Sequence, residues 1–245
     1  MLIIVDARLP HAALKRLGDF GIVFPHMPQQ SAYPAIAAHP DIFFCPLDNM
    51  LVVSPSVDAH TLAHLSNNNV QFILGKTHCG NRYPQTAAYN AVVTGNMIIH
   101  HKLYTEPAIL QNLPGHEFVH VNQGYTRCNL LPLGNNNFIT SDTGIYKTLS
   151  NIGKRVMLAG SSQVMLEGYP HGFIGGSAGV SEKTVFFAGS LKYHHQGAQI
   201  RRFLEEAEHK IVELYDGPLI DGGSIFFYKL INRQVEIENY RILLI

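Results

Sequence analysis

The strongest constraint on the fold is an internal repeat that runs through the whole chain. Residues 123–158 read as a strand (Cys128 to Leu133), a Gly-Asn turn, a second strand (Phe138 to Thr140), a short amphipathic helix and a third strand (Arg155 to Leu158). Asp142 stands where a side-chain oxygen is needed to begin the helix, and Asn and Gly tolerate the positive φ of a tight turn. A β-β-α-β unit of this size cannot bury its apolar faces alone, so further copies are expected.

Four further copies of this unit are found. Residues 39–75, 86–121 and 169–215 contain the same order of elements. The fifth copy is divided: Ser224 to Tyr228 supplies its first strand, and residues 1–25 supply its second strand, helix and third strand. A unit completed by both chain ends predicts a ring closed by the N- and C-terminal segments, with no free sheet edge. The predicted fold class is therefore α/β, a five-unit pseudo-symmetric ββαβ propeller in which residues 1–245 form one domain.

This pattern resembles the pentein, or guanidino-group-modifying, superfamily. That superfamily comprises arginine and agmatine deiminases, amidinotransferases, dimethylarginine hydrolases and a non-enzymatic ribosome anti-association factor. The resemblance covers almost the whole chain and implies a pentein-like fold. It also implies attack by a thiolate on a guanidino carbon, with a His as general acid and base and with Asp or Glu side chains that bind the substrate nitrogens. It implies no cofactor and no metal.

Two motifs of the superfamily are altered here. Deiminases typically carry Gly-Gly-Asn-x-His-Cys near the C-terminus, and the matching stretch, residues 222–227, reads Gly-Gly-Ser-Ile-Phe-Phe. Phe227 therefore stands at the position of the nucleophile. The mid-chain His-x-Asp motif falls, within one residue, on residues 169–171, which read Tyr-Pro-His. The resemblance consequently predicts the fold more strongly than the activity.

The candidate site lies at the lead segments, the short polar or Gly-rich stretches that precede the five first strands. These are residues 39–41, 86–90, 125–129, 169–171 and 221–224. Pseudo-symmetry would place them around one axis, which brings together the candidate residues His39, Asp41, Asn90, Arg127, Cys128, His171 and Asp221. Carboxylates suit a guanidinium or ammonium group, an Arg suits a carboxylate, and a His with a Cys suits covalent catalysis. We expect His171 and Cys128 to be catalytic and the other five to bind the substrate.

The identity of the nucleophile stays open between Cys128, Cys45 and none. Cys45 lies between Phe44 and Pro46 and reads as a small buried hydrophobe. Cys128 is next to Arg127, and a neighbouring cation lowers the pKa of a thiol.

Composition excludes several classes of protein. The formal net charge is zero and the 18 Lys and Arg residues form no run, so no electrostatic footprint for nucleic acid or an anionic membrane is present. No apolar run reaches the 18 or so residues of a membrane span. The N-terminal Leu2 to Val5 is too short for a signal peptide and is expected to be a core strand. Three cysteines, an odd number, favour a reducing cytoplasm over a disulfide framework.

Three other patterns suggest chemistry. His116 to His120 fits the HExxH zinc motif, which requires a helix, but this stretch reads as a third strand, on which residues four apart lie roughly 13 Å from each other. The run Gly172 to Gly179 is interpreted as a bulged strand rather than a phosphate loop, because no P-loop lysine is present. The pairs His100-His101 and His194-His195 have no third ligand in sequence.

Three connections between units, residues 25–40, 75–85 and 159–170, are expected to gather on one side of the ring. The first is long for a compact domain and the second carries varied polar groups, whereas the third is blander. Two functions remain open: a pocket for a guanidino or amino-acid-like small molecule, with or without turnover, and a non-enzymatic binding or assembly module. An HExxH zinc hydrolase is the third alternative. The oligomeric state does not follow from the sequence.

Overall fold

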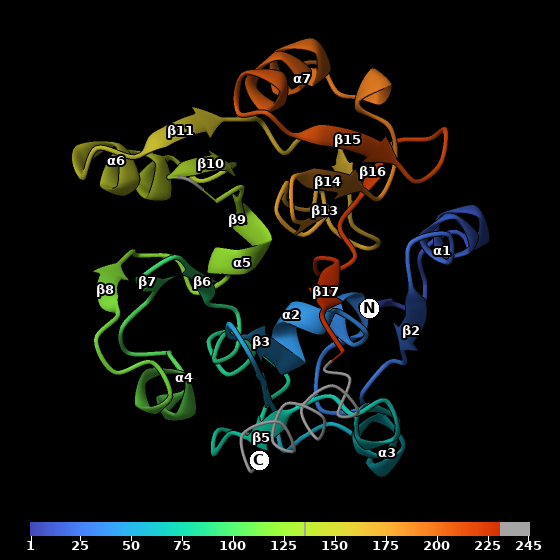
Figure 1. Cartoon of the computed structure of the whole chain (residues 1–245), viewed down its shortest axis with the longest axis vertical. Coiled ribbons are helices and arrows are strands. Elements are labelled where there is room, and N and C mark those ends of the chain that lie inside the picture. Colours follow the sequence, from blue (N-terminus) through green and yellow to red (C-terminus); the bar gives the residue numbers. More distant parts are fainter. Residues whose placement is uncertain (135, 231–245) are drawn as a thin grey trace, which may run out of the picture.

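The computed structural model describes residues 1–134 and 136–230, in a mixed α/β fold. Five three-stranded sheets surround a common centre (Figure 1). In each sheet the second strand is central; it runs antiparallel to the first strand and parallel to the third. A helix makes the crossover between the two parallel strands, as such a connection requires.

The unit made from both chain ends consists of β17 (Phe226–Tyr228), β1 (Leu2–Asp6), α1 (His11–Leu17) and β2 (Ile22–His26). The pairing of β17 with β1, Leu2 opposite Tyr228 and Ile4 opposite Phe226, confirms the prediction that the C-terminal strand joins the N-terminal unit. Asn135, in the predicted turn, and residues 231–245 lie outside the described residues.

The other four units follow in chain order. The second has β3 (Phe44–Pro46), β4 (Leu51–Val53), α3 (Ala59–Asn67) and β5 (Phe72–Leu74). The third has β6 (Val92–Thr94), β7 (Met97–His100), α4 (Pro107–Gln111) and β8 (Glu117–His120). The fourth has β9 (Leu130–Pro132), β10 (Asn137–Thr140), α6 (Thr143–Asn151) and β11 (Arg155–Leu158). The fifth has β13 (Ala178–Ser181), β14 (Thr184–Phe187), α7 (Gly197–Glu206) and β15 (Lys210–Glu213).

Six further short elements are present. They are the one-turn helices α2 (Pro40–Phe43) and α5 (Thr126–Asn129), the 3-10 turns η1 (Pro34–Ile36) and η2 (Leu191–Tyr193), and the parallel pair β12 (Val164–Met165) and β16 (Leu219–Ile220). Of these, η2 lies within the fifth unit, between β14 and α7, and the other five lie between units.

The second strands have an apolar run of two to four residues, because both of their faces are buried there. In β1, Leu2 and Ile4 pack against the second unit, whereas Ile3 and Val5 pack against the fifth. The same period-2 division recurs in β4, β7, β10 and β14, so each of five apolar clusters lies between two neighbouring units. Continuous apolar runs are the expected pattern for strands covered on both faces.

Each helix of a unit buries one narrow stripe, such as Ile145 and Leu149 in α6 or Ile200 and Leu204 in α7. This i, i+4 spacing places the two side chains on one face. The side chain of Asp142 accepts a hydrogen bond from the amide of Ile145 (2.8 Å) and so caps α6 as predicted.

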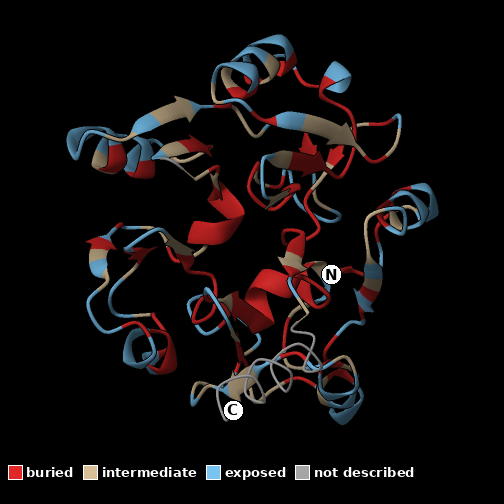
Figure 2. Cartoon of the chain, in the orientation of Figure 1, coloured by how far each residue is buried: buried red, intermediate tan, exposed pale blue. Residues whose placement is uncertain are grey.

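Three predictions from the sequence are wrong. A ring without free sheet edges was expected, but the strands form separate three-stranded sheets. The third strand of a sheet, such as β5 or β11, is a partly exposed edge. Asp41 and Cys128 do not begin strands but lie in α2 and α5, and both of these one-turn helices are completely buried near the centre (Figure 2). The run from Gly172 is a turn that becomes strand β13 only at Ala178.

Candidate functional site

The lead segments are joined to one another by a closed cycle of hydrogen bonds, which we call the hydrogen-bond ring. Each bond links neighbouring units, and five bonds complete the cycle: Asp41 N to Gly223 O (3.1 Å), Asn90 Nδ2 to Asp41 O (3.1 Å), Arg127 N to Asn90 O (2.9 Å), Gly176 N to Cys128 O (2.8 Å) and Ser224 N to Gly176 O (2.8 Å). The fifth unit contributes Gly176 and not the expected Tyr169–His171. The ring is therefore closed by these bonds and by the apolar clusters, not by a continuous sheet.

Cys128, part of the hydrogen-bond ring, contacts the polar side chains of Asp41 and Asn90. Its thiol donates to Asp41 Oδ2 (3.0 Å), and Asn90 Nδ2 lies 3.2 Å from its sulfur. The amide of Cys128 donates to Asn90 Oδ1 (3.1 Å), and Ser224 Oγ donates to the same Asp41 Oδ2 (2.9 Å). All four side chains are buried. Four units thus hold the carboxylate and the thiol in fixed contact.

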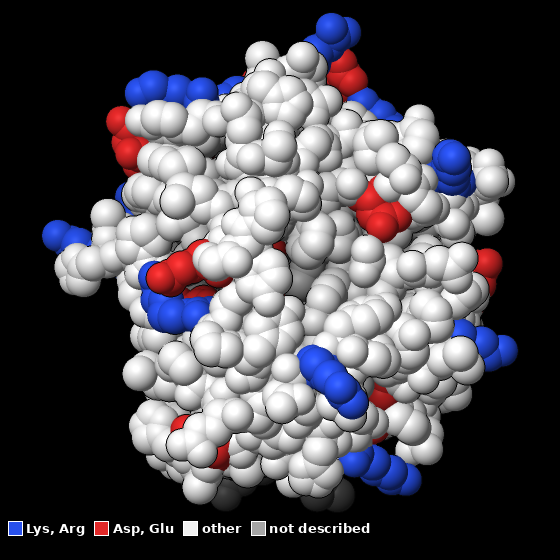
Figure 3. All heavy atoms as spheres, turned by 180° about the vertical axis from the view of Figure 1, so that it is seen from behind, with Lys and Arg blue, Asp and Glu red and all other residues white. Residues whose placement is uncertain are grey.

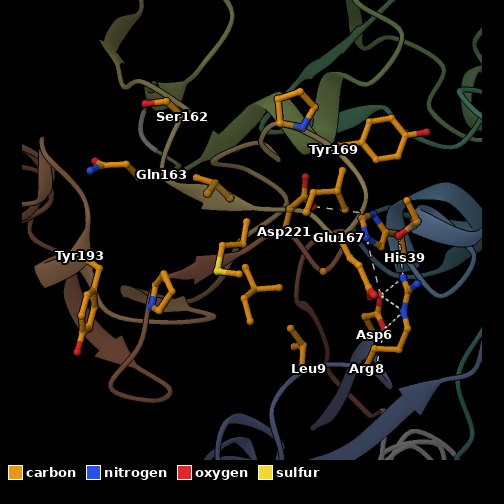
Figure 4. Close-up of a pocket in the computed structure, with 18 residues that line it drawn as sticks. Asp6, Arg8, Leu9, His39, Ser162, Gln163, Glu167, Tyr169, Tyr193 and Asp221 are labelled. Carbon is orange, nitrogen blue, oxygen red and sulfur yellow. Dashed lines mark hydrogen bonds and ion pairs between the residues drawn. The ribbon is translucent and has the colours of Figure 1, made fainter.

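A second polar group borders the first. His39 lies between two buried carboxylates, with Nε2 3.8 Å from Asp6 Oδ2 and Nδ1 3.8 Å from Asp221 Oδ1 (Figure 4). Asp6 accepts from the Arg8 guanidinium, at 2.6 Å from Nη2 and 3.0 Å from Nε. Asp221 accepts from the amides of Phe173 (2.9 Å) and Gly223 (3.0 Å).

The close packing around His39 requires glycine. Gly223 has φ +66°, and a Cβ there would lie 2.2 Å from the Cβ of His39. Gly176 is equally restricted, because a Cβ would lie 2.0 Å from Asp221 Oδ1. Side chains at these positions would displace the imidazole or the carboxylate.

Two hollows meet at His39 and Asp221. The inner cavity, of about 160 Å³, is lined by Cys128, His39, His171 and Asp221 together with Tyr33, Ile36, Ile42, Tyr125, Leu166, Tyr169 and Phe173. The outer hollow, of about 750 Å³, shares His39, Leu166, Tyr169 and Asp221 with it and adds Asp6, Arg8, Glu167 and Tyr193 among others. Figure 4 shows Glu167, Tyr169 and Asp221 on the same side as His39. A ligand could therefore extend from the inner cavity into the outer hollow.

The inner cavity has a negative electrostatic character. Burial raises the pKa of Asp221 to about 6, and the charge of Asp41 raises it further against the opposing effect of His39. Burial also raises the pKa of the Cys128 thiol well above its usual value, and the carboxylates of Asp41 and Asp221 add to the rise. Asp41 Oδ1 and both ring nitrogens of His39 are buried and have no hydrogen-bond partner among residues 1–134 and 136–230.

Arg127 does not lie with the other candidate residues. Its Nη1 donates to the carbonyls of Gly175 (2.9 Å) and Leu130 (3.3 Å), and its Nη2 donates to that of Ala178 (3.2 Å). It lines a separate cavity of about 300 Å³ and neither of the hollows at His39. The adjacent guanidinium does not lower the pKa of the Cys128 thiol: burial and then the carboxylates of Asp41 and Asp221 raise it.

The remaining candidates are placed as follows. His171 is exposed at the inner cavity, and its Nδ1 lies 3.2 Å from Ser161 Oγ and 2.9 Å from Gly172 O. Cys45 is fully buried, its sulfur is 3.8 Å from Ala91 O, and burial raises its pKa to about 12. Cys45 lines none of the cavities described here.

The histidine patterns have structural contacts. His120 lies in strand β8, as predicted, where its Nε2 is 3.1 Å from Asn122 Oδ1. His100 is buried with Nδ1 2.9 Å from Thr105 Oγ1 and Nε2 2.9 Å from Gly124 O, and burial lowers its pKa to about 4. His194 Nε2 lies 2.8 Å from Gly160 O. No group of three or more His, Cys, Asp or Glu residues that could hold a metal ion occurs in the described parts of the chain.

Asp6, Arg8 and Ser224 were missed by the sequence analysis. Asp6 is the last residue of β1 and follows four apolar residues, and this carboxylate at the end of an apolar strand could have identified it as a site residue. The third connection, judged bland, contributes residues 162–167 to the outer hollow, whereas residues 75–85 line neither hollow at His39.

Among the described residues, no helix has the length and apolar character needed to span a bilayer. On the face opposite to that of Figure 1, acidic and basic side chains are scattered and form no single-sign patch (Figure 3).

Comparisons with known proteins extend these findings. Dimethylarginine dimethylaminohydrolase of Pseudomonas aeruginosa, solved as a Cys-to-Ser mutant with citrulline, superimposes with a TM-score of 0.53 at 7% identity, over 86% of this chain and 91% of that one. An agmatine deiminase of C. jejuni gives 0.54 at 8% identity over 86% and 74%. An inosamine-phosphate amidinotransferase of Streptomyces griseus gives 0.50 at 8% identity over 94% of both chains.

The predicted resemblance to the pentein superfamily is thereby confirmed at the level of the fold. No curated protein matches the sequence. Residues 4–226 match the model of a family described as a family of unknown function (DUF6873).

Proposed function

The chain belongs to that family of unknown function, DUF6873, and we propose that it binds a small molecule through a cationic guanidinium or amidinium group in the inner cavity. The observation that carries this proposal is a pair of buried carboxylates at the hydrogen-bond ring, neither of which forms an ion pair with a Lys or Arg side chain of the described residues. Asp41 and Asp221 are buried, and no Lys or Arg lies within 4.0 Å of either among the described residues.

A buried carboxylate without a partner is costly unless a cation or hydrogen-bond donors satisfy it. Asp41 Oδ1 has no such partner among the described residues, and neither ring nitrogen of His39 makes a hydrogen bond there, although each lies 3.8 Å from a carboxylate oxygen. A planar guanidinium offers several N–H donors in a fixed fork, which suits two carboxylates better than a single ammonium does. The inner cavity, about 160 Å³, has room for such a head group, and the outer hollow, about 750 Å³, for the rest of the molecule.

We place Asp221 and His39, which line the inner cavity, as the residues that contact the cation. Asp41 lines neither hollow and acts through its buried charge, in contact with Cys128. Asn90 and Ser224 act as positioning residues, since both bond Asp41 or Cys128. Arg127 is not part of this site. The five like units around these lead segments fit a pseudo-symmetric propeller in a single domain, and three free, buried cysteines fit a reducing compartment.

Turnover at Cys128 is a second candidate function, favoured by the presence of Cys128, His39 and His171 in one cavity. The thiol would lose its proton once a bound cation offsets the two carboxylates, and the thiolate would add to the central amidinium carbon. Loss of one nitrogen as an amine, protonated by a neighbouring imidazole, would leave an isothiouronium on Cys128. Water would then release a urea and restore the thiol.

Thermal unfolding tests the binding proposal. Titration with agmatine or arginine should raise the midpoint of unfolding, because a ligand specific to the folded state stabilises it. Citrulline, in which a urea replaces the guanidinium, should do so far less. Asp41→Asn should abolish the shift, while the matched control Asp48→Asn, which removes an exposed carboxylate, should retain it.

Turnover has a separate readout. Mass spectrometry should detect an adduct on Cys128, or free ammonia or urea, only in the protein that retains this thiol. Binding without any product would retain the pocket and exclude the enzyme. The absence of a shift with every guanidino compound would remove the proposal and leave the non-enzymatic assembly module.

A further inference from the structure

Arg127 lies in a second cavity, which opens among the five first strands and is not assigned to any function. This cavity, of about 300 Å³, is lined by residues from all five units: Pro46, Ala91–Thr94, Arg127, Pro132–Gly134, Val180, Glu182 and Ile225–Phe227. Apart from Arg127, which lies in a lead segment, these residues belong to the first strands or to the residues next to them. The two cavities share no lining residue. We refer to the second one as the strand-side cavity.

Two adjacent residues of α5 thus face different cavities. Cys128 lines the inner cavity and Arg127 the strand-side cavity. Successive side chains of a helix point about 100° apart, which allows a one-turn helix to divide its residues between two directions. The hydrogen-bond ring, of which α5 is a part, lies between the two cavities.

The guanidinium of Arg127 is incompletely satisfied within the described residues. Arginine has five N–H donors, and the three bonds that are present all go to main-chain carbonyls, those of Leu130, Gly175 and Ala178. No carboxylate of the described residues lies within ion-pair distance of it. A guanidinium that is 7% exposed and forms no ion pair within that part of the chain is unusual, since burial of a charge is costly. Burial lowers the pKa of Arg127, and the charges of Asp41 and Asp221, beyond ion-pair distance, oppose that effect.

The walls around this charge are largely apolar, and the one carboxylate among the lining residues, the exposed Glu182, pairs with Lys229 at 3.5 Å. Val92, Val93, Val180, Ile225 and Phe227 contribute alkyl or aromatic surface to the cavity. The ring of Phe226 lies 5.6 Å from the guanidinium carbon and covers one of its sides. An apolar wall lowers the local dielectric constant and so strengthens the attraction between the guanidinium and an anion.

From this geometry we propose that the strand-side cavity binds a small organic carboxylate, with the carboxylate on Arg127 and the apolar body against the strand residues. A carboxylate matches the planar fork of a guanidinium and can accept from two donors at once. Ligand sites of this kind are concave and apolar with few polar groups, and about 300 Å³ is the lower end of their usual volume. The ligand is consequently a compact molecule, such as a benzoate-sized or branched-chain acid.

Benzoate is the probe, and benzamide, of nearly the same shape but uncharged, is its control. At a benzoate concentration about ten times Kd, the unfolding midpoint should rise by roughly 3–6 °C. Benzamide and an equal concentration of sodium chloride should not reproduce the rise. The chain has no Trp, so unfolding is followed by calorimetry or by circular dichroism.

Variants locate the site. Val180→Phe fills the cavity and leaves Arg127 in place, and it should remove the benzoate effect. Arg127→Met removes the charge with the same expected loss. Lys210→Met removes an exposed cation elsewhere and should keep the full effect. If Arg127→Met does not fold, Val180→Phe decides the matter alone.

A benzoate effect that persists in Val180→Phe, or no effect in the unmodified protein, would overturn the proposal. A rise produced equally by benzamide would show an apolar cavity that does not use Arg127, and would overturn the anion assignment. Because agmatine binds in the inner cavity, Val180→Phe should respond normally to agmatine, and Asp41→Asn should respond normally to benzoate. The two proposals therefore fail independently.

Discussion

Replacement of Asp41 by Asn is expected to convert Cys128 from an unreactive thiol into a more reactive one. The thiol donates to Asp41 Oδ2 at 3.0 Å, and ionisation would place two negative charges at that distance. At an effective dielectric constant of about 20, the repulsion across 3 Å is about 5 kcal/mol, an upper bound of about 4 pKa units. Relaxation and the competing loss of a hydrogen bond reduce this, so we expect a fall of about 1–3 units.

The fall in pKa should be visible in alkylation kinetics. Burial, the largest cause of the raised pKa of Cys128, is unchanged by the substitution, as is the charge of Asp221. At pH 8 the thiolate fraction should therefore rise at least about tenfold, and so should the rate at which iodoacetamide modifies Cys128. Peptide mapping by mass spectrometry measures the rate over pH 7 to 10. Asn keeps an oxygen that can accept from Ser224, so the local structure should survive.

Two internal controls are present in the same chain. Cys45 and Cys79 are buried with pKa values raised to about 12 and about 11, mainly by burial, and their rates should not change. Parallel acceleration at all three cysteines would indicate general loosening of the protein. If the pH profile of Cys128 alkylation is the same in Asp41→Asn as in the unmodified protein, the carboxylate of Asp41 does not keep the thiol protonated, and the argument is refuted.

Three further outcomes are expected. Asn90→Ala removes three buried hydrogen bonds to Asp41 and Cys128, and should lower the free energy of unfolding in urea by about 2–4 kcal/mol; a change below 0.5 kcal/mol, roughly the limit for surface sites, would contradict its positioning role. The pKa of Asp221 is raised on folding from 3.8 to about 6, so its stabilising protonation is complete below pH 3.8 and is lost as the pH rises through 6. Between pH 4 and 7, Asp221→Asn should therefore gain about 2 kcal/mol relative to the unmodified protein, and parallel pH profiles of the two would contradict the raised pKa. In urea unfolding, Gly223→Ala should lower the free energy of unfolding far more than Gly95→Ala. Both glycines have positive φ, but a Cβ at Gly223 would lie 2.2 Å from the Cβ of His39, whereas nothing lies within 4 Å of a Cβ at Gly95. Equal losses of stability would show that packing at His39 does not matter.

The sequence by itself determined the repeating architecture, because the information is local and periodic. The apolar runs of β1 and β14 and the cap residue Asp142 identify their elements without knowledge of distant residues. The similarity of the segment at Ser224 to Tyr228 to the first strands of other units predicted the pairing of the two termini. Each of these inferences depends on a side-chain period or on turn chemistry, which are set within a few residues.

Only the tertiary structure decided how the candidate residues are divided. Arg127 and Cys128 are neighbours in the chain, and the sequence predicted that both belong to one site. The stretch forms the one-turn helix α5 instead of the expected strand, because the hydrogen-bond ring ties the amide of Arg127 to Asn90 and the carbonyl of Cys128 to Gly176. Those partners lie 37 and 48 residues away in the chain, and no local pattern encodes them.

The electrostatics of the site were also beyond the sequence. Adjacency to an arginine suggested an activated thiol, whereas the folded chain places Asp41, 87 residues away, in direct contact with that thiol. The effect of a charge depends on its distance through space and on the exclusion of water, and both are fixed only when the five units close around one centre.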